Sequence, residues 1–232
     1  MTPDCDHGWA MTQSIHFTDQ ELRTFVTDEL QYDPSIEAQR ISVVAESGTV
    51  TLSGETTSLA EKHNVKRSTM RVRGVSSIVD KMTVRNPGST GATDADLAEV
   101  AAKILDWAAD VPAKSVKATV QNHVITLSGN VAWDYQREAA TRALENLRGV
   151  TEIKNSMLID QPTSKSPAMN LVAAALKRSS LVDSKAVHVD VRDHELMLSG
   201  NVGSFAEYRQ AERIAWASPG VTMVTNNLRI GS

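Results

Sequence analysis

The chain repeats one pattern of apolar and polar positions three times, at offsets of 75 and then 71 residues. Each copy begins with apolar residues at helical spacing, which predicts an amphipathic helix. The expected inward faces of these helices are Leu22, Phe25, Val26 and Leu30, then Leu97, Val100, Ala101 and Leu105, then Ala168, Leu171, Val172 and Leu176. An alternation of period two follows at Ile41, Val43 and Ala45 and at the equivalent positions, which is typical of a half-buried strand.

The most recognisable part of the repeat is a second strand that reads Val-Thr-Leu-Ser-Gly, Ile-Thr-Leu-Ser-Gly and Leu-Met-Leu-Ser-Gly and closes on Gly54, Gly129 and Gly200. We expect each Ser to end its strand and each Gly to allow close packing. Residue types that tolerate a positive φ separate the two strands, which predicts a tight hairpin. These turn residues are Ser47-Gly48, Asn122-His123 and Asp193-His194, and we interpret the two histidines as turn residues and not as ligands.

A second helix and a third strand complete each copy. Ser58 and Ser204, each followed three residues later by Glu, predict a capped helix start, whereas copy two has Trp133 at this position. Gly74, Gly149 and Gly220 are expected to end these helices. The order is therefore αββαβ. We predict an α+β chain of three tandem small modules, each a three-stranded mixed sheet with two helices packed on one face.

The repeat sets the domain boundaries. We place the domains at residues 16–86, 92–161 and 166–231, because turn-rich linkers at 86–92 and 161–167 separate the copies. Residues 1–15 show no periodic pattern and are expected to be disordered. Three small cores also suit the composition, since only 4% of the residues are aromatic.

Charge and targeting signals narrow the function classes. The net charge of −4 argues against a surface dedicated to nucleic acid, and the single Cys5 excludes an intrachain disulfide. The N-terminus, read from Met1 or from Met11, has neither a basic nor an apolar signal region, and we find no membrane span. We therefore expect a cytoplasmic protein, which leaves open a peripheral position at the inner membrane.

The assembled pattern of Val-Thr-Leu-Ser-Gly, a helix, Gly-Val and an apolar strand resembles the BON domain, three times from about Phe17 to Ile230. Asn155 and Asn226 lie six residues after the helix-ending glycine, where copy one has Asp80. The resemblance implies bacterial osmotic-stress and envelope proteins that have been proposed to bind phospholipid surfaces. The family that the chain resembles also includes a cytoplasmic member that binds potassium. Its members share no catalytic residues.

Candidate chemistry is sparse. The six histidines form no metal-binding or hydrolase motif, and neither a Walker loop nor a dinucleotide fingerprint is present. Three Ser-Gly pairs without a repeated His do not indicate nucleophiles. We therefore predict that the chain is not an enzyme and needs no metal or other cofactor.

Charge segregation in copy one is the clearest binding signal. Cations gather on its second helix and third strand, against acidic residues on its first helix. One hypothesis is a site for an anionic lipid surface or a protein partner; the alternative is a solvated face paired with Glu21, Asp28 and Glu29. The candidate site residues are Lys62, Lys66, Arg67, Arg71 and Arg73, with Trp133 and Tyr135 of copy two as a second contact.

Three functions remain open at this point. The first is a non-enzymatic binding or scaffold protein of the osmotic or envelope stress response that engages anionic phospholipid or a protein partner. The second is a cytoplasmic sensor of potassium or of a small ligand, and the third is a structural array that only spaces its partners. Sequence patterns leave the oligomeric state and the arrangement of the modules undetermined.

We expect Trp107 and Trp216, which lie in predicted helices, to be partly buried.

Overall fold

Three small domains make up the described part of the computed structural model, which comprises residues 17–85, 92–160, 169–183 and 185–231. The predicted disorder of residues 1–15 concerns a segment outside these ranges. Each domain contains one three-stranded sheet, in the orders β1-β2-β3, β4-β5-β6 and β7-β8-β9. The predicted αββαβ order is confirmed in all three copies.

The bounds of the elements repeat from domain to domain. Domain 1 contains α1 (Asp19–Tyr32), the short 3₁₀ helix η1 (Ala38–Arg40), β1 (Ile41–Glu46), β2 (Thr49–Thr56), α2 (Leu59–Thr69) and β3 (Ser77–Val84). Domain 2 contains α3 (Asp94–Trp107), β4 (Val116–Gln121), β5 (Val124–Val131), α4 (Asp134–Leu144) and β6 (Glu152–Ile159). Domain 3 contains α5 (Met169–Arg178), β7 (Val187–Arg192), β8 (Glu195–Val202), α6 (Phe205–Trp216) and β9 (Met223–Ile230).

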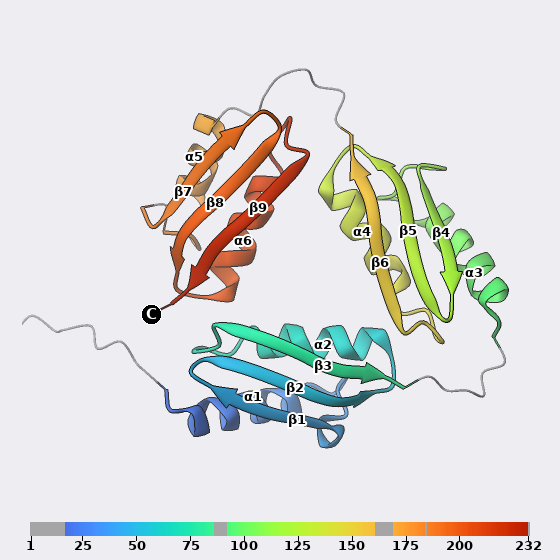
Figure 1. The fold of residues 1–232 in the computed structure, drawn as a ribbon, viewed down its shortest axis with the longest axis horizontal. Helices are drawn as coiled ribbons and strands as arrows, with labels where there is room; N and C mark the ends of the chain where they lie inside the picture. Colours follow the sequence, from blue (N-terminus) through green and yellow to red (C-terminus); the bar gives the residue numbers. More distant parts are fainter. Residues whose placement is uncertain (1–16, 86–91, 161–168, 184, 232) are drawn as a thin grey trace, which may run out of the picture.

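The sheet topology follows the predicted hairpin and crossover. β1 pairs antiparallel with β2, which places Val43 opposite Leu52, and β2 pairs parallel with β3 after the crossover through α2. Side chains alternate along β2, so that Val50 and Leu52 are fully buried while Thr51 between them is only half-buried. Figure 1 shows both helices of each domain on the same side of its sheet. Among the described residues, no helix lies on the other face of these sheets.

The glycine of the repeat is required by a close backbone contact. Gly54 has φ +127°, and a Cβ at this position would overlap the carbonyl oxygen of Arg40. Gly129 and Gly200 have the same conformation and meet the equivalent carbonyl. The prediction of close packing is confirmed, but the prediction that the preceding Ser ends the strand is wrong. β2 continues to Thr56, because the parallel pairing with β3 extends past the glycine.

Helix starts follow the predicted caps with one substitution. The Ser58 hydroxyl accepts a hydrogen bond from the Glu61 backbone N–H at 3.1 Å. In domain 2 Trp133 offers no side-chain acceptor, and the side chain of Gln136 accepts instead from the backbone N–H groups of Ala132 and Trp133. One side chain three residues into the helix therefore caps α4.

One position of the predicted inward helix face is exposed in every copy. Phe25, Val100 and Leu171 are equivalent, and their exposed fractions are 42%, 41% and 62%. The buried stripe of α1 consists only of Leu22, Val26 and Leu30, because one narrow sheet covers little more than one side of the helix. The predicted partial burial of Trp107 is also wrong, since it is 87% exposed at the end of α3.

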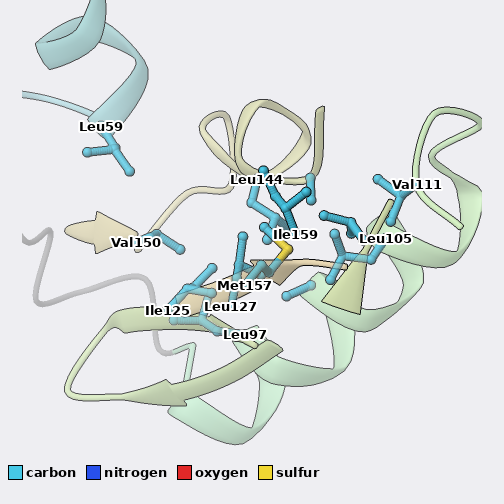
Figure 2. Close-up of a cluster of buried hydrophobic side chains, with 13 residues drawn as sticks. Leu59, Leu97, Leu105, Val111, Ile125, Leu127, Leu144, Val150, Met157 and Ile159 are labelled. Atoms are coloured by element: carbon cyan, nitrogen blue, oxygen red, sulfur yellow. The ribbon is translucent and has the colours of Figure 1, made fainter. Parts of the chain in front are cut away.

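The second helices bring the domains together. Leu59, the first residue of α2, is 5% exposed and belongs to the buried core cluster of domain 2 (Figure 2). Phe205, at the equivalent position of α6, packs against the core of domain 1. Between domains 2 and 3, the Arg137 guanidinium of α4 lies 4.6 Å from the centre of the Trp216 ring. Each second helix thus contacts the next domain, and the third contact returns to the first.

These three contacts close the domains into a ring. Figure 1 shows β3, β6 and β9 toward its middle and β1, β4 and β7 toward its outside. A contact in which different surfaces of like units meet generates a closed ring when the rotation between units suits it. Here the three units are parts of one chain, so the ring forms within a single molecule.

Candidate binding surfaces

The predicted basic helix of domain 1 is partly neutralised by its own sheet. The Nζ atoms of Lys62 and Lys66 lie 3.4 Å and 3.6 Å from the Asp80 carboxylate on β3. Lys62 also donates to the backbone carbonyl of Met82 at 2.7 Å. Two lysines share one acid, so this cluster keeps one net positive charge. It lies over an edge strand, and the lysines do not extend freely into solvent.

The remaining cations of this region divide into paired and unpaired groups. Arg71 lies 3.1 Å from Glu29 of α1, which realises part of the predicted pairing with the first helix. Other basic side chains are exposed and form no ion pair with any carboxylate in the described ranges; these are Arg67, Arg73, Lys81 and Arg85. The structure therefore separates the predicted site into two classes of cation.

The second predicted contact lies at the start of α4. Trp133 is half-buried as the N-cap residue, and Tyr135 is 56% exposed. The neighbouring Asp134 and Arg137 face domain 3, so the two predicted aromatic residues flank the joint between domains 2 and 3. The structure does not bring them together with the cations of domain 1.

Charged groups are buried in that joint. Asp134 is 8% exposed and forms an ion pair with Arg137, whose guanidinium lies over Trp216. Burial raises the pKa of the Asp134 carboxyl above its ordinary value, because Arg137 offsets the lost hydration only in part. Burial likewise raises the pKa of Glu212 on α6, with Arg209 opposing and Asp134 adding to the shift. Two carboxyls with raised pKa values therefore lie at one interface.

Acidification is expected to strengthen this joint. Because the folded pKa values of Asp134 and Glu212 lie above their unfolded values, their contribution is fully present below the ordinary carboxyl range. It is lost as the pH rises through the raised values. The Asp134→Asn, Glu212→Gln double variant should therefore melt above the parent at about pH 7 and lose the advantage near about pH 4. Melting curves of both proteins across this range test it; a difference independent of pH would contradict it.

Sequence patterns missed this joint, although one signal for it exists. The first residue of each second helix is expected to face solvent, yet it is apolar in two copies, as Leu59 and Phe205. An apolar residue repeated at such a position indicates a contact outside its own domain. Asp134 occupies the same position in copy two, and nothing in the sequence marks it as buried.

The hairpin histidines lie in the turns between the first two strands of domains 2 and 3, as predicted, and each ring also contacts a second turn. His123 Nδ1 lies 3.0 Å from the carbonyl oxygen of Gly149, and His194 Nδ1 lies 2.8 Å from that of Gly220. Each ring thereby joins the hairpin to the turn that ends the second helix. In the residues that the structure describes, no three His, Cys, Asp or Glu side chains are grouped so as to hold a metal ion.

The comparison with known families agrees with the geometry of the three domains. A sequence profile described as the BON domain matches residues 18–86, 93–161 and 170–232. The chain belongs to the BON domain family. The three matched ranges coincide with the three sheets and their helices, so each structural domain is one BON domain.

Individual relatives extend this finding. The chain is 34% identical over 140 residues to osmotically-inducible protein Y of Escherichia coli strain K12, in a match that covers 57% of this chain and 69% of that protein. Among solved structures, CdsD, a structural protein of the type III secretion system of Chlamydia trachomatis, is 15% identical with a TM-score of 0.25, and the match covers 88% of this chain and 90% of that one.

The length and hydrophobicity of the helices decide whether any of them could cross a membrane. Within the described ranges, the BON domains contain no helix that is both long and apolar enough to cross a membrane.

Proposed function

We propose that this triple BON protein is a non-enzymatic binding scaffold of the osmotic or envelope stress response that attaches to anionic phospholipid surfaces through domain 1. The observation that carries the proposal is that four exposed cations, from α2 to just after β3, form no ion pair with a carboxylate of the described residues; these are Arg67, Arg73, Lys81 and Arg85. Such cations attract anionic headgroups without first breaking an ion pair within the protein. The similarity to osmotically-inducible protein Y supports the stress association.

The ring holds the domain that carries these cations in contact with the other two domains. Domain 1 contacts domain 2 through Leu59 and domain 3 through Phe205, so attachment of domain 1 orients the whole molecule. Near a membrane surface each basic side chain contributes about 1 kcal/mol, and salt screens the attraction over about 10 Å. Each cation that reaches the surface therefore adds to a weak, reversible and salt-dependent attachment.

Vesicle sedimentation tests the proposal with a matched pair of variants. We expect the parent to pellet with phosphatidylglycerol vesicles at low salt and not with phosphatidylcholine vesicles. Arg67→Ala with Arg73→Ala should weaken binding by about 2 kcal/mol, or roughly 30-fold. The control is Arg142→Ala with Arg148→Ala, because these arginines occupy the equivalent positions of domain 2. Equal losses in the two variants, or no pelleting of the parent, would rule out this site.

A further inference from the structure

The first helices of the three domains carry an exposed stripe that the fold does not cover. On α3 the stripe consists of Asp96, Val100, Lys103 and Trp107, which follow one another at helical spacing. Val100 is 41% and Trp107 is 87% exposed. An exposed Trp and an exposed Val two turns apart on one side of a helix mark an interaction surface.

The charge around the α3 stripe is negative. Asp94, Asp96 and Asp106 lie on α3 with Glu99, and Lys103 is engaged by Glu99 at 2.6 Å. An anionic lipid surface would be repelled here. The chemistry that fits is a second amphipathic helix with exposed aliphatic side chains and free cations.

The same chain contains such a helix in α5. Leu171 is 62% exposed on α5, and Leu181 just after it is 56% exposed. Lys177 and Arg178 in the last turn are exposed, and neither forms an ion pair with a described carboxylate. The described part of α5 carries no acid, so its charge is opposite to that of α3.

The two stripes match in length and polarity when the helices run antiparallel. Val100 and Trp107 are seven residues apart, as are Leu171 and Arg178, and at 1.5 Å per residue both pairs span about 10 Å. An antiparallel arrangement that sets Leu171 against Trp107 places Arg178 opposite Val100, about one helical turn from Asp96 of α3. It also aligns the helix dipoles favourably.

We propose that α3 of one molecule binds α5 of a second copy, which joins the rings head to tail. Figure 1 shows α3 and α5 in different domains, both beside the outer strands of the ring. One molecule therefore presents both halves of the contact in different directions. Such a contact between unlike surfaces builds open chains of molecules.

Sedimentation velocity with complementary variants tests this contact. The parent should show a weight-average mass that rises with concentration. Lys177→Glu with Arg178→Glu removes the α5 half, and Val100→Ser with Trp107→Ser removes the α3 half. Each variant alone should be monomeric, because one half of every contact is missing, whereas an equimolar mixture should form dimers and nothing larger.

The controls separate charge from misfolding. The α5 reversal combined with Asp96→Lys and Glu99→Lys should restore self-association, which a folding defect would not allow. Arg142→Glu with Arg148→Glu makes the same charge change elsewhere and should leave the mass unchanged. A parent that stays monomeric up to about 1 mM, or a mixture that shows no dimer, would overturn the proposal. Neither result depends on vesicle binding by domain 1.

Discussion

Gly129→Ala is expected to lower the free energy of unfolding of domain 2 by about 4 kcal/mol. The Ala would have to adopt φ +130°, a conformation that L side chains rarely adopt. Its Cβ would also overlap the carbonyl oxygen of Ser115, which is backbone and cannot rotate away as a side chain would. Strain and overlap therefore add at this position. Hydrogen exchange of β4 and β5 peptides measures the loss in domain 2 alone.

The control lies in the same domain. Gly149 also has a positive φ, +93°, but a Cβ there would approach Leu97 only to 3.5 Å, an ordinary contact. Gly149→Ala should therefore carry the backbone strain without the overlap, and cost about 1–2 kcal/mol. Equal protection factors in the two variants would show that the close approach of the Ser115 carbonyl is not what requires glycine at 129.

Leu59→Ala should lower the free energy of unfolding by about 2–4 kcal/mol, as expected for truncating a buried leucine. The effect should appear in domain 2, although Leu59 belongs to domain 1, because its side chain is part of the domain 2 core cluster, at the edge of that cluster (Figure 2). The ring contact between the two domains should open as well. Urea unfolding measures the stability loss, and small-angle scattering measures the increase in the radius of gyration.

An exposed leucine supplies the comparison for this prediction. Leu181 is 56% exposed, so Leu181→Ala should change stability by less than about 0.5 kcal/mol. If Leu59→Ala were as mild as Leu181→Ala and left the radius of gyration unchanged, Leu59 would not be a ring contact in solution.

Candidate sites were harder to predict than elements, for a physical reason. The distribution of charge along the sequence shows the cations of copy one, but their partners depend on side-chain packing across the fold. Asp80 is a single acid in a basic stretch, and only the register of β3 beside α2 places it near both Lys62 and Lys66. Arg71 meets Glu29 because α1 and α2 pack together on one face of the sheet.

Local periodicity by itself determined the repeat, the αββαβ order, the hairpin turns and the glycines. These features depend on hydrogen bonding and steric limits within a few residues, or on one strand pairing with the next. Only the tertiary structure decided which apolar residues are covered, because coverage depends on what lies opposite. Phe25 and Leu59 show this: a predicted core residue lies 42% exposed, and a residue at a helix start is 5% exposed in the core of a neighbouring domain.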